Sequence, residues 1–348
     1  MQLNRILTAT LIAMSATLML PAYGQTNITL VAYSGLFQDK YMAAVVEPFM
    51  KKNPDIKVTY FGMPGSAAML GGLRAQKAAP QSDVVIMDVS VSKAGTDEGL
   101  FEKIDEKSVP SISELYPMAR IADIAGVAVT FDSMVLLYNS DQVKEAPKSW
   151  KALADKAYQG KVVIPGMPDI QGLSLVMVLD KAAGGSGAAS LYDKGIQAMA
   201  PIAPNVMTWE PKPDVYAPII AGQAAIGIGW NARAQVNTDT SGGKLRATLP
   251  AEGSVFQINT IQLVKGSAKA DAARKFINYA LGAEAQKAFT ESMFYAPTNS
   301  KAQIAPSAID RTAVKQLDRM IPVDWLGVAK VRDQVIEQWR RRVIPLSR

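Results

Sequence analysis

The chain has 348 residues and a formal net charge of +6, and it contains neither histidine nor cysteine. Without histidine there can be no Ser-His-Asp or Cys-His catalysis and no HExxH zinc site, and without cysteine there are no disulfides and no Cys-acylated lipid anchor. The length suits two domains of ordinary size, and the mild basic excess gives no reason to expect nucleic acid as a partner.

The first residues have the pattern of an export signal. Arg5 is a positive n-region, Ile6–Leu20 is an uncharged apolar run, and Ala22–Gly24 has the small-x-small pattern of a cleavage site. The apolar run is short for a membrane span. We expect cleavage after Gly24 and a periplasmic mature protein.

The segment that follows alternates strand and helix patterns. The predicted strands are Ile28–Ala32, Ile56–Phe61 and Asp83–Met87, and the predicted helices are Asp39–Lys52 and Ala67–Gln76, with Ser66 as an N-cap. In a parallel sheet the carboxyl ends of the strands share one edge. The pattern therefore predicts a common rim carrying Tyr33 and Ser34, Ser66, and Asp88.

In the middle of the chain the regular alternation of strand and helix patterns ends. Ile124–Thr130 and Met134–Asn139 are predicted as two strands separated by a short turn, and Lys161–Ile164 as another. A Gly/Pro-rich loop over 165–172 then opens a helix at Leu173–Ala183. Amide groups at such a helix start suit an electron-rich ligand group, with Gln171 nearby. Asp169 can either face an amine or act as an N-terminal dipole partner.

The stretch from Gly222 to Asn259 is the centre of the prediction. A strand over Ala224–Gly229 runs into Trp230 and Asn231, just before a helix-compatible segment. An indole beside an amide at a strand end suits a small organic solute, and the alternative is a tryptophan that caps a core. Residues 227–232 also match a loose G-x-G-x-x-A dinucleotide pattern. The bulk of Trp230 opposes a pyrophosphate there, so no cofactor is expected.

The C-terminal third is predicted to be mainly helical. Amphipathic patterns cover Ala268–Leu281 and Ala283–Phe294, and Asp324 is expected to cap a final helix ending near Arg340-Arg341-Arg342. The three arginines are interpreted as a solvated helix end that complements the macrodipole. No linker, repeat or catalytic motif stands out.

Several segments together resemble the periplasmic solute-binding proteins of ABC importers, of the spermidine/putrescine-binding type. The resemblance is carried by ITLVAYSG, GVAVTFDSMVLLYNSDQV, WKALADKAYQGKVVIP, AGQAAIGIGWNARAQV and AARKFINYALGAEAQKAFTESMFYAPTNSKA. It implies an α/β fold of two lobes (type II), each a mixed sheet flanked by helices, with crossovers near Phe131–Leu137 and Phe256–Ile261. The implied division is 25–132 with 260–302 for the first lobe and 133–259 with 303–348 for the second.

The same resemblance implies a non-enzymatic, monomeric binding protein that captures a small polar organic solute between its lobes. Its partner would be an inner-membrane permease, with no metal and no nucleic acid. Trp230 matches the aromatic box of polyamine binders, whereas the next box tryptophan and the amine-binding aspartate fall at Gln257 and Asn259. An ammonium would lose its carboxylate there, which favours another polar solute. The expected ligand-binding residues are Tyr33, Ser34, Ser66, Asp88, Asp169, Gln171, Trp230, Asn231 and Asn259.

Three alternatives remain at this point. The chain could bind polyamines proper, or it could be a periplasmic sensor partner that feeds a membrane receptor. The third alternative is a secreted carboxylate-based hydrolase, which predicts turnover and a close acidic pair in the cleft.

Overall fold

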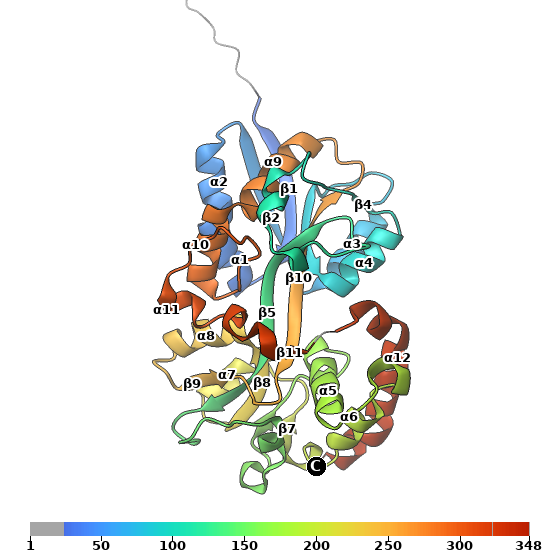
Figure 1. The fold of residues 1–348 in the computed structure, drawn as a ribbon, viewed down its shortest axis with the longest axis vertical. Helices are drawn as coiled ribbons and strands as arrows, with labels where there is room; N and C mark the ends of the chain where they lie inside the picture. The colour runs from blue at the N-terminus through green and yellow to red at the C-terminus, as the bar shows by residue number, and fades with distance from the viewer. Residues whose placement is uncertain (1–23, 322, 348) are drawn as a thin grey trace, which may run out of the picture.

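The computed structural model describes residues 24–321 and 323–347. Apart from Gly24, the predicted export signal lies outside the described residues. The chain forms two lobes, one above the other, connected by strands that pass between them (Figure 1). Strands and helices are mixed in both lobes, which confirms the predicted α/β fold of two lobes.

The elements follow in chain order. The strands are β1 (Thr26–Tyr33), β2 (Ile56–Met63), β3 (Val84–Asp88), β4 (Phe101–Glu102), β5 (Val127–Asn139), β6 (Val162–Val163), β7 (Val206–Thr208), β8 (Ile226–Trp230), β9 (Leu245–Thr248), β10 (Ser254–Val264) and β11 (Met320–Ile321). The helices are α1 (Leu36–Tyr41), α2 (Glu47–Lys52), α3 (Ser66–Ala75), α4 (Val89–Asp97), α5 (Ile170–Ala182), α6 (Asp193–Ala198), α7 (Tyr216–Ile220), α8 (Asn231–Thr240), α9 (Ala270–Leu281), α10 (Ala283–Met293), α11 (Pro306–Ile309) and α12 (Trp325–Arg342).

The upper lobe is built on the order β2-β1-β3-β10. β1 runs parallel to β2 and β3, and β10 is antiparallel to β3. All five residues of β3 are buried, as expected for a strand covered on both faces. Because β1 and β3 are parallel, their carboxyl ends reach the same edge of the sheet, which faces the lower lobe (Figure 1).

The lower lobe is built around β8, which pairs antiparallel with β5 and parallel with β6. α5 is buried continuously from Gly172 to Asp180. A helix that is apolar on every side belongs inside the protein, and α5 accordingly packs in the same hydrophobic core as Trp150 and Trp339. This core fixes the position of β8 and hence of Trp230 at its end.

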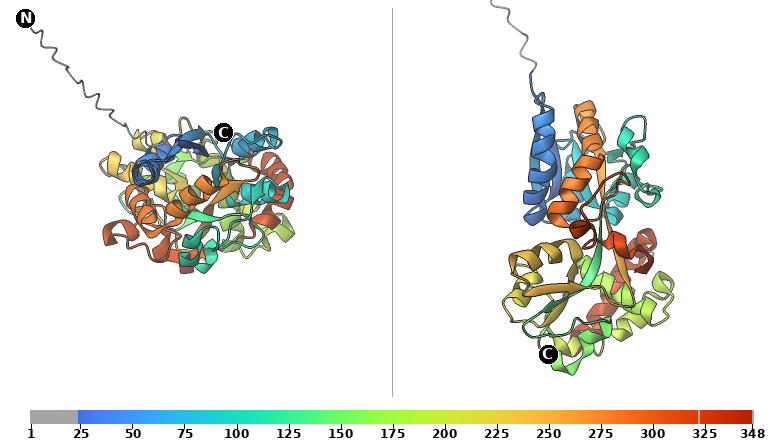
Figure 2. Two further views of the ribbon diagram at one scale, coloured as in Figure 1. Left: turned by 90° about the horizontal axis from the view of Figure 1, so that it is seen from above. Right: turned by 60° about the vertical axis from the view of Figure 1, so that its left-hand side comes forward.

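β5 and β10 connect the lobes and are paired with each other along the crossover. Phe131 lies opposite Ile258, and Ser133 lies opposite Phe256. The right-hand view of Figure 2 shows the two strands passing between the lobes. The residue boundaries given above for each lobe stay a prediction.

The predicted turn in the middle of β5 is wrong. Two separate strands were expected around Phe131-Asp132-Ser133, but β5 is continuous because these residues belong to the ladder with β10. The buried Asp132 is tolerated because the main-chain N–H of Ala232, in the first turn of α8, donates to its carboxylate (3.1 and 3.3 Å).

β10 is likewise one continuous strand, from Ser254 to Val264. Its pairing register with β5 shifts between Asn259 and Thr260, which marks a local irregularity. Within 24–321 and 323–347, no helix has the length and apolar character that a membrane crossing requires.

Candidate functional site

A cavity of about 630 Å³ lies between the lobes. Its walls come from strand ends and helix starts of both lobes, as in other α/β proteins that hold ligands at the carboxyl ends of strands. The polar and aromatic side chains around it are Tyr33, Ser66, Arg74, Asp88, Ser90, Asp169, Gln171, Trp230, Arg233, Gln257, Tyr295, Trp325, Arg332 and Asp333.

The upper wall is a connected hydrogen-bond network. The Tyr33 hydroxyl lies 2.8 Å from the Ser66 hydroxyl and donates to Oδ1 of Asn259 at 2.9 Å. The main-chain N–H of Asp88 donates to the same Ser66 oxygen at 2.9 Å. Ser66 was predicted as an N-cap, but the cap position of α3 is Gly65 and makes no side-chain bond. Ser66 instead links the ends of β1 and β3.

Asp88 places a buried carboxylate in this wall. Its side chain is the N-cap of α4 and accepts bonds from the Ser90 N–H (2.9 Å) and the Ser90 hydroxyl (2.6 Å). Burial raises the pKa of Asp88 above its ordinary value, although the Ser90 bonds and the positive charge of Arg332 act in the opposite direction. A cationic ligand group would favour the ionised carboxylate.

Trp230 ends β8 and is only 6% exposed. The Tyr216 hydroxyl holds the main chain of Trp230 in place. It accepts from the Trp230 N–H and donates to the Trp230 carbonyl, both at 3.0 Å. The indole lines the cavity and also belongs to the hydrophobic core of the lower lobe. Trp230 is therefore part of the cavity wall and part of the core, so its position agrees with both interpretations given above.

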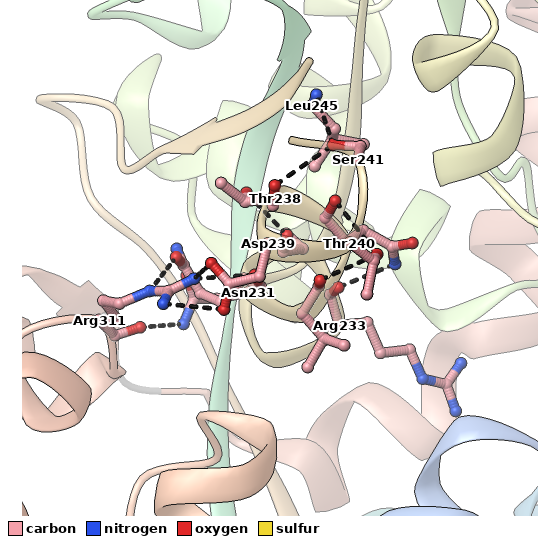
Figure 3. Close-up of polar contacts among 12 residues, drawn as sticks. Asn231, Arg233, Thr238, Asp239, Thr240, Ser241, Leu245 and Arg311 are labelled. Carbon is pink, nitrogen blue, oxygen red and sulfur yellow. Dashed lines mark hydrogen bonds and ion pairs between the residues drawn. The ribbon is translucent and has the colours of Figure 1, made fainter. Parts of the chain in front are cut away.

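Arg233 is the unexpected feature of the cavity. Its Nε is buried and has no hydrogen-bond partner among the described residues. In Figure 3 its guanidinium points away from Arg311 and the polar contacts on the other side of α8. An unpaired buried donor of this kind is rare, because it loses its water without gaining a bond. A guanidinium in this state is suited to an anionic ligand group, above all a carboxylate.

Two glutamine oxygens in the cavity wall are also unpaired. Oε1 of Gln171, near the start of α5, and Oε1 of Gln257, on β10, are buried without a hydrogen-bond partner. Both are acceptors, so they suit an ammonium or hydroxyl group of a ligand. Asp169 lies beside Gln171 and is the N-cap of α5, accepting from the Gln171 N–H at 2.8 Å. The Gln171 N–H is one of the helix-start donors that were expected to bind a ligand, and it is therefore already bonded to Asp169.

α12 closes one side of the cavity from the lower lobe. Trp325, Val328 and Arg332 contribute to the lining, and Asp324 accepts from the Gly327 N–H at 2.9 Å at the start of the helix, as predicted. Arg332 donates to the carbonyl of Pro168 at 2.7 Å and remains exposed. It lies at the mouth of the cavity, whereas Arg233 lies deeper.

Six of the nine predicted ligand-binding residues line this cavity. They are Tyr33, Ser66, Asp88, Asp169, Gln171 and Trp230. Their shared location follows from the strand ends and helix starts on which the prediction was based. Whether they contact a ligand stays a prediction.

The structure does not bring the other three to the cavity. Ser34 is exposed beyond the end of β1. Asn231 donates from Nδ2 to the Arg311 carbonyl at 2.8 Å, because the helical turn that starts after Trp230 directs it away from the cavity. Asn259 is buried behind Tyr33, and its Nδ2 donates to Thr130 Oγ1 at 3.0 Å. None of these three residues is therefore among those that line the cavity.

The sequence prediction missed Arg233, Tyr295, Trp325 and Arg332. Tyr295 and Arg332 are far from the other site residues in sequence, and no local pattern points to them. Arg233 did have a signal: on a helix, a residue two positions after Asn231 lies on nearly the opposite face. Because Asn231 points away from the cavity, Arg233 points toward it.

The described residues hold no group of three or more Asp or Glu side chains that could bind a metal ion. The cavity offers equal numbers of arginine and aspartate side chains, four aromatic side chains and unpaired hydrogen-bonding groups. Such a set can orient and hold a polar solute of both charges.

Comparison with known proteins gives consistent matches. The chain is 26% identical over 277 residues to the gamma-aminobutyric acid-binding protein of Pseudomonas aeruginosa, covering 75% of this chain and 76% of that one. It is 22% identical to the spermidine/putrescine-binding periplasmic protein of Escherichia coli, covering 92% and 93%. Among solved structures, an extracellular solute-binding protein from Bordetella parapertussis has a TM-score of 0.76 at 25% identity, covering 91% of this chain and 98% of that one.

The family comparison covers most of the chain. Residues 44–316 match the bacterial extracellular solute-binding proteins, a span that includes both crossover strands and most of the cavity wall. The two-lobe fold and the interlobe cavity agree with that match. The chain belongs to the family of bacterial extracellular solute-binding proteins.

Proposed function

We propose that this protein is the periplasmic substrate-binding component of an ABC importer, and that its solute is a small zwitterion with a carboxylate and an ammonium group. The observation that carries the second part is the buried, unpaired Nε of Arg233 in the wall of the interlobe cavity. Delivery would be to permease subunits in the inner membrane, by a monomer exported with cleavage after Gly24 and without catalysis.

The carboxylate is assigned to Arg233. A buried guanidinium without a hydrogen-bond partner gains most from an anionic oxygen, because charge-assisted bonds are stronger where water is excluded. Tyr33 and Tyr295 also line the cavity, and both are close enough to Arg233 to interact with its charge.

The ammonium is assigned to the acceptor-rich part of the cavity. Asp88 and Asp169 supply carboxylates from the two lobes, and Gln171 supplies an unpaired acceptor. A ligand that contacts both lobes stabilises their closed arrangement, because its affinity then differs between the open and closed states.

The relatives are compatible with this charge pattern. One is named for gamma-aminobutyric acid, which has one carboxylate and one ammonium, and others are named for polyamines, which have ammonium groups alone. Arg233 opposes a second ammonium at its end of the cavity. The site therefore favours an amino-acid-like solute over a diamine.

Isothermal titration of Gln25–Arg348 with 4-aminobutyrate, putrescine and butyrate tests the proposal. Putrescine replaces the carboxylate of 4-aminobutyrate by an aminomethyl group, and butyrate removes the ammonium. We expect 4-aminobutyrate to bind more tightly than either of the other two. Putrescine binding as tight or tighter would restore the polyamine interpretation.

A wider thermal-shift panel of amino acids and opines accompanies the titration, because a cavity of about 630 Å³ has room for a zwitterion larger than 4-aminobutyrate. A ligand present at ~100 times its dissociation constant adds about 2.7 kcal/mol of stability. A stable protein that responds to no zwitterion in the panel would contradict the proposed solute class.

A further inference from the structure

The segment between α10 and α12 returns from the upper lobe to the lower lobe on the side of α8 that faces away from the cavity. Arg311 lies in this segment, just after α11. Its contacts with α8 are drawn in Figure 3. They involve both its side chain and its main chain, so they fix the segment as well as the helix.

The side chain of Arg311 makes a fork of hydrogen bonds with α8. Its Nε donates to Gln235 Oε1 at 2.9 Å, and its Nη2 donates to the Gln235 carbonyl at 2.8 Å. Its Nη1 and Nη2 also reach the two carboxylate oxygens of Asp239 at 3.0 and 2.9 Å. The Arg311 carbonyl accepts from Asn231 Nδ2 at 2.8 Å.

Helical periodicity explains why three residues of α8 can all bond to Arg311. Asn231, Gln235 and Asp239 are spaced four residues apart, so they form a stripe on one face of α8. Arg233 is two residues from Asn231 and therefore lies about 200° around the helix, toward the cavity. Fixing the stripe fixes the rotation of α8 and the direction of Arg233.

The same guanidinium also connects the lobes. It lies 3.9 Å from the centre of the Phe294 ring, which immediately follows α10 in the upper lobe. α10 itself packs against α8. Arg311 is thus held between an aromatic ring of one lobe and a helix of the other.

We infer that Arg311 is a positioning residue that holds α8 against the upper lobe and thereby sets both the direction of Arg233 and the interlobe arrangement. An exposed ion pair alone contributes little to stability, and Asp239 is half exposed. The role therefore lies in geometry: a planar fork with several fixed donors orients a helix in a way that a lysine ammonium does not.

Arg311 and the ligand anchor can be tested separately, because the interlobe arrangement is measurable without any ligand. The chain has no cysteine, so the double variant Ala75→Cys and Ala182→Cys allows one spin label on α3 and one on α5. Both positions are exposed. The distance distribution between the labels is then compared in this background with and without Arg311→Ala.

We expect Arg311→Ala to broaden the distribution and add longer distances, and we expect Arg311→Lys to restore it only in part. Arg120→Ala is the matched control, since Arg120 forms an ion pair with Glu106 (3.0 Å) within the upper lobe. It should leave the distribution unchanged. A distribution for Arg311→Ala that superimposes on that of the parent would overturn the inference, even if the thermal midpoint falls.

Ligand binding gives the second readout and rests on the proposed function. For 4-aminobutyrate we expect Arg311→Ala to weaken binding roughly five- to tenfold, as for lost positioning bonds rather than a lost ligand contact. If the distances change as expected but no zwitterion binds even the parent, the proposed solute class fails while the inference about Arg311 stands.

Discussion

The two walls of the cavity differ in how far their hydrogen bonds are complete. In the upper wall, Tyr33, Ser66 and Asp88 bond to one another and to neighbouring groups. In the lower wall, the buried Nε of Arg233 and Oε1 of Gln171 have no partner in the described parts of the chain. The hydrogen bonds of the upper wall are complete without a ligand, whereas the proposed ligand would complete those of the lower wall.

This difference teaches which wall determines ligand choice. A buried polar atom without a partner costs about 1–3 kcal/mol, so a ligand that satisfies it gains that energy on binding. The upper wall can define shape and position, but its polar groups already have partners. We therefore expect the lower wall to select the charge of the solute.

The largest expected effect comes from removing the lower-wall anchor. Arg233→Ala should weaken binding of 4-aminobutyrate by about 2–5 kcal/mol, roughly 30-fold or more, because truncating a buried charge leaves its partner unpaired. Isothermal titration measures the change. Arg332→Ala, at the exposed mouth of the same cavity, is the control and should have a much smaller effect. The reverse order would remove Arg233 as the anchor.

A smaller effect is expected in the upper wall. Ser66→Ala removes the acceptor of the Asp88 N–H and the partner of the Tyr33 hydroxyl, so about 1 kcal/mol of stability should be lost. Binding should weaken less than tenfold, since the ligand contacts of the lower wall remain. Titration and thermal unfolding of the same sample separate the two changes. A binding loss as large as that of Arg233→Ala would break the distinction between the walls.

We expect the free energy of unfolding to depend on pH through Asp132, a buried carboxyl on β5 that supports the lower wall. Burial raises its pKa to about 8, although bonds from the Ser133 and Ala232 N–H groups and the charge of Arg233 act to lower it. Between its unfolded pKa near 4 and about 8, the unfolded state binds fewer protons than the folded state. The contribution of Asp132 is therefore full below pH ~4 and is lost as the pH rises toward 8.

Asp132→Asn should flatten this loss, because the one amide oxygen can still accept from the Ser133 and Ala232 N–H groups without ionising. The check is chemical denaturation of parent and variant between pH 5 and pH 8.5. Asp105→Asn is the control: hydrogen bonds from Ser108 lower the pKa of Asp105, so this carboxyl stays ionised throughout the range and its curve should run parallel to that of the parent. If the Asp132→Asn and parent curves stay parallel across this range, the carboxyl does not titrate with folding.

The smallest expected effect comes from Asn259→Asp, which tests the polyamine interpretation. Asn259 is 1% exposed and lies behind Tyr33, so a new carboxyl there is reluctant to ionise. We expect putrescine binding to improve only a few-fold at neutral pH. A gain that makes putrescine tighter than 4-aminobutyrate would show that the charge preference is set by position 259 instead of Arg233.

Much of this architecture could be predicted from sequence, because local patterns determine it. The strand ends that carry Tyr33 and Asp88 were found from apolar runs, and the cap at Asp324 from residue type. The error at Asn231 has a specific cause. Trp230 ends a strand and Asn231 begins a helix, so two adjacent residues point in different directions.

The rest of the site depends on contacts between distant parts of the chain. Arg332 reaches the cavity only because α12 packs across the lower lobe, and Tyr295 only because the chain turns after α10. Continuity of β5 likewise depends on its pairing with β10. None of these has a local signature.

The pairing of β5 with β10 has a consequence for motion. Because the connection between the lobes is a hydrogen-bonded two-stranded ribbon, the lobes can rotate by twisting it without breaking its bonds. Hydrogen–deuterium exchange should therefore be slow along the paired stretch of β5 and β10 and faster in the exposed loops around it. We therefore expect the pivot between the lobes to be among the most protected parts of the backbone.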